Sequence, residues 1–174
     1  MPTISGVLVR PEAPADYAAI AAITEAAFGK AREARMVEAI RASDGFVPEL
    51  SLVAEDEAEI VGHILLSYVS LEEDSRRLLE LGPISVRPDR QRTGIGGALV
   101  RAALAIADER GEPLVLVLGH PSYYPTFGFR PASGLGIVPP DGIPDEAWMA
   151  ITLSAYRPEL RGRVVFPPAY SVEA

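Results

Sequence analysis

The feature that most restricts the fold of this chain is a strand, a turn and a helix in direct succession. Residues 78–86 form an apolar run with the composition of a buried strand. The turn that follows ends at Gly94, and apolar residues then recur at helical spacing from Ile95 to Ile106. The next segment, 114–118, is continuously apolar, which is typical of a strand covered on both faces. This succession predicts an α/β sheet.

The rest of the chain extends this unit to one domain. Apolar periodicity predicts helices over 17–28 and 32–42. Further strands are predicted over 4–10, 50–55, 60–71 and 148–153. The 174 residues contain no repeat, low-complexity tract or linker, so we expect a single domain over 1–174. This order of elements favours a mixed sheet with helices on both faces.

Composition excludes several kinds of site and partner. The chain has no cysteine, which removes disulfides, thiolate nucleophiles and cysteine-based metal sites. His63 and His120 are the only histidines, so we expect no metal site. A net charge of −8 argues against a nucleic-acid partner, and no apolar stretch reaches the roughly 20 residues of a membrane span. Residues 1–5 lack a basic region followed by an apolar run, so we expect no signal peptide and a cytoplasmic protein.

The turn and helix start at residues 91–97 predict an anion site. The first N–H groups of a helix have no intrahelical acceptor and lie at the positive end of its dipole. Glycines at Gly94 and Gly96 allow a phosphate to approach the backbone, although a tight turn without ligand is the alternative interpretation. Between residues 87 and 101, four arginines against one aspartate give a local charge of +3. Neither a Walker loop nor the dinucleotide-binding fingerprint fits the spacing.

Several motifs together resemble one family. Gln91-x-x-Gly94-x-Gly96 is similar to the acetyl-CoA pyrophosphate loop of the GNAT superfamily of N-acetyltransferases. Other segments resemble that family in the same order: Val9-Arg10-Pro11 with Asp16, Val86-x-Pro88, the Ile95/Leu99 helix and Tyr124-Pro125-Thr126-Phe127-Gly128-Phe129. Leu81-Gly82-Pro83 and Gly119-His120-Pro121 resemble its YhbS-like subgroup. The likeness runs from about residue 7 to residue 130. It implies the GNAT fold, with a mixed central sheet of about seven strands, and acetyl-CoA as co-substrate.

The resemblance also implies roles for individual residues. The backbone of Ile84 and Val86 would hold the pantetheine arm where two parallel strands separate, with an N–H near Ile84 facing the thioester oxygen. Pro83 would mark a bulge or the end of strand pairing. Tyr124 would protonate the leaving thiolate, with a plain core tyrosine as the alternative interpretation, while Tyr123 would pack inward. The pyrophosphate would lie on the following loop residues: Gln91, Arg92, Thr93, Gly94, Ile95, Gly96 and Gly97.

The sequence leaves the general base open. Glu80 either points into the cleft as the base or is an exposed strand carboxylate. Glu33 is a further candidate, with a solvated helix face as the alternative. His63 is expected to be a hydrogen-bonded structural residue, and His120 either lines the site or caps its loop.

The expected function is direct transfer of an acetyl group from acetyl-CoA to a primary amine of a small molecule or a protein. Without cysteine there is no acyl-cysteine intermediate, so both substrates are expected to bind together. An acyl-CoA-binding sensor or interaction module without turnover is the alternative. A homodimer that completes the acceptor site also remains open.

Overall fold

The computed structural model describes residues 3–4 and 6–173. Most of the segment 1–5 that bears on a signal peptide therefore lies outside the described residues. The principal helices are α1 (Tyr17–Phe28), α2 (Arg32–Arg41) and α3 (Ile95–Glu109). The strands are β1 (Thr3–Ile4), β2 (Val7–Pro11), β3 (Phe46–Asp56), β4 (Glu59–Leu71), β5 (Asp74–Val86), β6 (Leu114–Leu118), β7 (Arg130–Pro131), β8 (Ile137–Val138), β9 (Trp148–Thr152) and β10 (Gly162–Val165).

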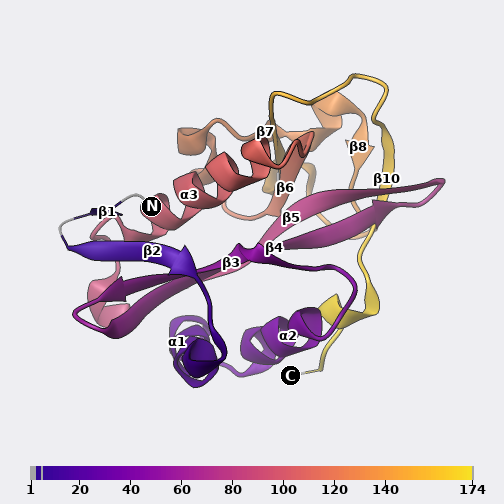
Figure 1. Ribbon diagram of the computed structural model, residues 1–174. Coiled ribbons are helices and arrows are strands. Elements are labelled where there is room, and N and C mark those ends of the chain that lie inside the picture. The colour runs from indigo at the N-terminus through magenta and orange to yellow at the C-terminus, as the bar shows by residue number, and fades with distance from the viewer. Residues whose placement is uncertain (1–2, 5, 174) are drawn as a thin grey trace.

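The strands form one mixed sheet in the order β1-β2-β3-β4-β5-β6-β9-β7, with β10 pairing to β4 and β8 (Figure 1). Neighbours on this path are antiparallel except β5 and β6, which are parallel, and β10 pairs with β8 in parallel. The sheet has ten strands rather than the expected seven or so. Strands β1, β7, β8 and β10, which the sequence does not predict as separate strands, have two to four residues each, too short to show a period-two pattern.

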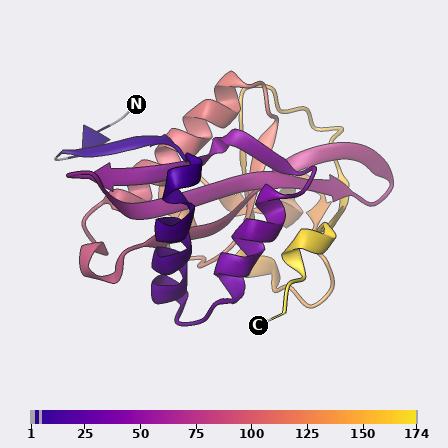
Figure 2. The ribbon, with the colours of Figure 1, turned by 60° about the horizontal axis from the view of Figure 1, so that its bottom comes forward.

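Helices cover both faces of the sheet, as predicted. α3 lies on one face, whereas α1 and α2 lie on the other (Figures 1 and 2). Strand alternation explains this arrangement, because Leu52 and Ala54 of β3 pack with the α3 side while Val53 packs with α1 and α2. No helix among the described residues is long and apolar enough to cross a membrane.

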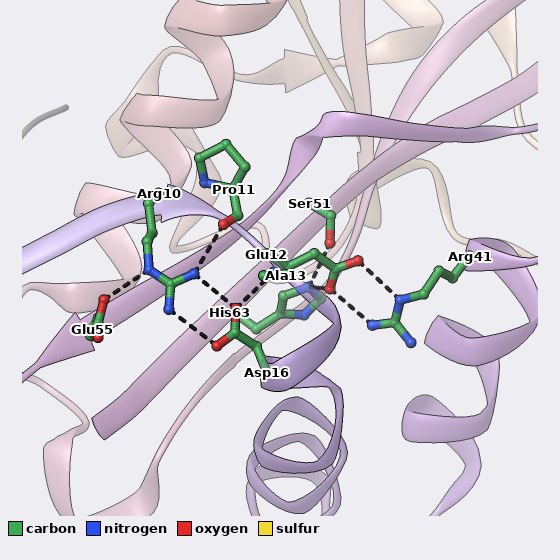
Figure 3. Close-up of polar contacts among 9 residues, drawn as sticks. All are labelled: Arg10, Pro11, Glu12, Ala13, Asp16, Arg41, Ser51, Glu55 and His63. Carbon is green, nitrogen blue, oxygen red and sulfur yellow. Dashed lines mark hydrogen bonds and ion pairs between the residues drawn. The ribbon is translucent and has the colours of Figure 1, made fainter. Parts of the chain in front are cut away.

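A polar cluster fixes the start of α1 against the sheet (Figure 3). Arg10 of β2 donates to Asp16 at 2.8 Å and to Glu55 of β3 at 2.8 Å. The Asp16 carboxylate also accepts the Ala13 backbone N–H at 2.8 Å. The Arg10 guanidinium is the largest cause that lowers the pKa of Asp16. These contacts stabilise the 3₁₀ turn Pro14–Asp16 that leads into α1, because the Asp16 carboxylate satisfies the otherwise unpaired backbone N–H of Ala13.

His63 is a structural residue of the same cluster, as expected. Its Nε2 lies 2.9 Å from Ser51 Oγ and 3.7 Å from Glu12 Oε2, and Glu12 pairs with Arg41 of α2 at 2.9 Å. Burial lowers the pKa of His63 to about 3, so its imidazole is neutral at ordinary pH. The cluster therefore joins β3, β4 and α2 through a neutral histidine.

Candidate functional site

Strands β5 and β6 pair over a short length and then separate. Their parallel ladder joins Leu79–Leu81 to Val115–Val117. On the other side of β5, the register with β4 changes between Leu81 and Ile84, which places a bulge at Gly82 and Pro83. Pro83 thus lies both at the bulge and just beyond the end of pairing with β6, as predicted.

The backbone groups of Ile84 and Val86 face the open side of β5. The Arg87 N–H donates to Val61 O of β4 at 2.8 Å. Because peptide groups alternate along an antiparallel pair, those of Ile84 and Val86 point away from β4. Gln91 Nε2 donates to Val86 O at 3.2 Å, so the loop side chain lies across this free edge.

The start of α3 presents backbone donors. Gly94 is its N-cap with a φ of 91°, a conformation that favours glycine, and the first intrahelical bond runs from Ala98 N–H to Gly94 O at 3.1 Å. The N–H groups of residues 95–97 therefore have no acceptor within the helix. A Cβ at Gly96 would come 3.2 Å from the Tyr123 hydroxyl, so a side chain there would crowd this approach. The Ile95 side chain is buried in the core instead.

The expected local charge of +3 is largely offset in the structure. Arg87 pairs with Glu59 at 3.1 Å, and Arg90 pairs with Asp56 at 2.7 Å. Asp56 is the last residue of β3 and Glu59 is the first residue of β4, so both acidic partners lie far from the arginines in the sequence. Arg92 is the arginine of this segment that lines the adjoining cavity. The backbone donors, rather than a group of arginines, are thus the main feature of the predicted anion site.

Two cavities meet beside this loop. The loop-side cavity, of about 620 Å³, is lined in part by Val86, Gln91, Arg92 and Gly96. The helix-side cavity, of about 550 Å³, is lined in part by Arg32, Glu33, Met36, Glu80, Phe166 and Tyr170. Both cavities are lined by the same four residues: Phe28, Ile84, His120 and Tyr124. Of the predicted loop residues, Gln91, Arg92 and Gly96 line the loop-side cavity, whereas Thr93, Gly94, Ile95 and Gly97 do not.

Tyr124 stands at the junction of the cavities. It begins a short 3₁₀ helix, Tyr124–Phe127, and its ring packs edge-to-face against Tyr123 and Phe129. A Cβ at Gly119 would lie 2.3 Å from Tyr124 Cε2, so the glycine makes room for the ring. Burial, followed by the nearby Tyr123 and Glu80, raises the pKa of Tyr124 above its ordinary value, which keeps its proton in place. The expectation that Tyr123 packs inward is wrong: Tyr123 is 39% exposed and Tyr124 is 6% exposed.

Glu80 is buried and lines the helix-side cavity. It is 5% exposed, so the interpretation as an exposed strand carboxylate is wrong. Gly82 lies beside this carboxylate: a Cβ built at Gly82 would be 3.3 Å from both carboxylate oxygens of Glu80. Burial raises the pKa of Glu80 to about 8, against hydrogen bonds from Tyr170 and the Leu118 backbone. A carboxylate with this pKa can accept a proton near neutral pH.

The remaining candidates occupy the same region. Glu33 is buried rather than solvated, and its Oε1 lies 3.7 Å from Lys30 Nζ and 3.5 Å from Arg32. His120 lines both cavities, which favours the first interpretation, and its backbone carbonyl accepts the Tyr123 N–H at 3.1 Å. The described residues contain no group of three or more potential metal ligands.

Sequence reasoning missed Phe166 and Tyr170. Both lie in the C-terminal segment, yet both line the helix-side cavity. Tyr170 donates to Glu80 at 3.2 Å across 90 residues of sequence. No pattern in the sequence connects them; the aromatic character of the segment around Pro167-Pro168 was the one available signal.

Comparison with known proteins assigns this arrangement to a family. Residues 17–129 match the model of the Acetyltransferase (GNAT) family. The chain is 36% identical over 155 residues to the uncharacterized N-acetyltransferase YjhQ of Escherichia coli K12, covering 86% of each chain. It is 32% identical over 128 residues to the uncharacterized N-acetyltransferase YhbS of the same strain, covering 73% of this chain and 75% of YhbS.

Solved structures agree with the fold. A GNAT family acetyltransferase from Brucella melitensis, in complex with acetyl-CoA, superposes with a TM-score of 0.79 at 32% identity, over 95% of this chain and 98% of its own. Escherichia coli YhbS, in complex with CoA, superposes with a TM-score of 0.90 at 23% identity, over 100% of this chain and 97% of its own. The resemblance inferred from the motifs is thus confirmed.

Proposed function

This chain belongs to the GNAT family of acetyltransferases, and we propose that it transfers the acetyl group of acetyl-CoA directly to a primary amine of a small molecule or a protein. The observation that carries the proposal is the junction of two cavities at Tyr124, with Glu80 in one and the α3 start in the other. This arrangement can hold a donor and an acceptor at the same time, so that proximity supplies much of the rate.

The loop-side cavity suits acetyl-CoA. The N–H groups of residues 95–97 would bind the pyrophosphate, since Gly94 and Gly96 keep side chains away from that approach. The outward-facing peptide groups of Ile84 and Val86 would pair with the pantetheine amides in the manner of an added strand. An Ile84 N–H in this position would also stabilise negative charge on the thioester oxygen.

The helix-side cavity then receives the amine. Acetyl-CoA supplies an activated thioester, and the chain supplies the proton transfers. Glu80, whose pKa is about 8, would take the proton that the amine loses. Tyr124, which stays protonated, would give a proton to the departing sulfur, since protonation makes the thiol a better leaving group.

Release of the CoA thiol from acetyl-CoA across a panel of primary amines tests the proposal. We expect turnover with at least one amine, and a decrease in kcat of about 100-fold for Tyr124→Phe, the usual scale for removing a positioned acid. Tyr156→Phe is the matched control, because Tyr156 packs in a separate part of the core. Binding of acetyl-CoA without turnover on any amine would identify a sensor instead, and an unchanged kcat in Tyr124→Phe across pH would exclude Tyr124 as the acid.

A further inference from the structure

The C-terminal segment brings a phenol to the carboxylate of Glu80. The Tyr170 hydroxyl donates to Glu80 Oε2 at 3.2 Å and lies 2.5 Å from Ser67 Oγ. Ser67 and Glu80 are cross-strand partners on β4 and β5, so their side chains share one face of the sheet. The phenol therefore bridges two neighbouring strands at the wall of the helix-side cavity.

The segment that carries this phenol is firmly held. The Tyr170 ring stacks on Phe166 with centroids 5.0 Å apart, and Phe166 packs edge-to-face on Trp148 at 6.0 Å. Arg32 and Arg35 of α2 donate to the backbone carbonyls of Tyr170 and Glu173, at 3.5 and 3.2 Å. The segment lies beside α2 in both ribbon views (Figures 1 and 2). The position of the hydroxyl is thus determined by the stacking on Phe166 and the contacts with α2 as well as by its bond to Glu80.

Resting on the proposed acetyl transfer, we propose that Tyr170 is a positioning residue that orients the Glu80 carboxylate toward the acceptor amine and favours its ionised form. A phenol that donates to a carboxylate stabilises the charged state, because the hydrogen bond is stronger to an anion than to the neutral acid. Burial opposes this effect at Glu80. Tyr170 would then allow Glu80 to be ionised, and so to accept a proton, closer to neutral pH.

Other groups that face Glu80 also affect its ionisation. Tyr124 lies on the junction side and His120 follows β6, while Arg32 and Glu33 project from α2 into the same cavity. The Leu118 backbone acts in the same direction as Tyr170 and lowers the pKa of Glu80. None of these groups is altered by removing the Tyr170 hydroxyl, so a change in Glu80 titration in such a variant reports on that hydroxyl.

Tyr170→Phe tests the inference because it removes one oxygen and keeps the ring that packs on Phe166. The titration of Glu80 is followed by the ¹³C resonance of its side-chain carboxyl, assigned by its loss in Glu80→Gln. We expect the midpoint to rise by about one pH unit in Tyr170→Phe. The acid limb of kcat/KM, measured with the best amine of the panel, is expected to move up by the same amount, with a decrease of about tenfold at pH 7. Tyr156→Phe is expected to change neither quantity.

The titration and the kinetics distinguish failure of the inference about Tyr170 from failure of the proposed acetyl transfer. An unchanged Glu80 midpoint in Tyr170→Phe overturns the inference, and so does a shifted midpoint with an unmoved acid limb, since Glu80 would then not be the base that Tyr170 serves. In both cases acetyl transfer itself would stand. Absence of turnover by the wild-type protein on every amine would instead refute the proposed function, and the carboxyl titration would still report whether the hydrogen bond acts on Glu80.

Discussion

Replacing Glu80 with glutamine is expected to make the folded protein more stable, by an amount that grows with pH. The pKa of Glu80 is about 8 in the folded state because of burial, against an ordinary value of 4.5 in the unfolded chain. Between these pH values the unfolded chain releases the proton and the folded protein keeps it. The folded state binds more protons there, so its stability falls as pH rises.

The magnitude follows from the two pKa values. Stability decreases by up to about 1.4 kcal/mol for each pH unit within the window, which gives about 3 kcal/mol at pH 7 and about 5 kcal/mol as the upper limit above pH 8. Glutamine is uncharged throughout and keeps an oxygen that accepts from Tyr170. Glu80→Gln is therefore expected to match the wild-type free energy of unfolding near pH 4.5 and to exceed it increasingly at higher pH.

Urea unfolding at several pH values from 5 to 9 and constant ionic strength measures this difference. The buried His63 acts in the opposite direction, because a pKa of about 3 in the folded state, against 6.5, adds stability as pH rises between those values. His63 is present in both proteins, so its contribution cancels in the comparison. Glu146→Gln, which removes an exposed carboxylate outside both cavities, is the control for the loss of a negative charge. A difference between wild type and Glu80→Gln that does not increase from pH 5 to pH 8 would refute the reasoning.

Two further substitutions test the geometry of the site. Gly119→Ala places a methyl group 2.3 Å from Tyr124 Cε2, so the ring must move, and we expect kcat to fall at least about tenfold with acetyl-CoA affinity less affected, as measured by steady-state kinetics. Gly96→Asp places an acidic side chain beside the Tyr123 hydroxyl at the start of α3, and we expect acetyl-CoA affinity to fall by at least about tenfold in calorimetric titration.

Gly134 provides matched controls for both, because no atom lies within 4 Å of a Cβ built there. Gly134→Ala and Gly134→Asp are expected to leave kinetics and affinity unchanged. Full activity of Gly119→Ala would show that the position of the Tyr124 ring does not limit catalysis. Unchanged acetyl-CoA affinity of Gly96→Asp would place the diphosphate away from the helix start.

The sequence predicts the helices and central strands well because their apolar periodicity is continuous. The α3 stripe and the apolar run of β6 are both local patterns, and burial on the sheet produces them directly. The short strands β1, β7, β8 and β10 are missed because two to four residues cannot show a period. The donor loop is also local, since one turn and one helix start supply its backbone donors.

The acceptor side is less predictable because it depends on contacts between distant segments. Glu80 stands in an apolar strand whose two faces are both covered, so the sequence does not tell which face opens into a cavity. Tyr170 reaches it across 90 residues. The order of burial at Tyr123 and Tyr124 depends on the missing side chain of Gly119, which makes room for the second ring. Likewise, the sequence does not show that the charges of Arg87 and Arg90 are paired. Their partners, Glu59 and Asp56, flank the turn between β3 and β4.

The two cavities draw their walls from different parts of the chain. The loop-side wall comes mainly from the middle of the sequence, whereas the helix-side wall adds residues 32–36 and 166–170 to residues of segments 80–84 and 118–124. In the proposed reaction, mutations in these two outer segments would alter which amine fits and leave the acetyl-CoA side unchanged. Divergence of substrate choice among duplicated copies of such a gene is expected to accumulate at these outer segments, while the central part stays constant.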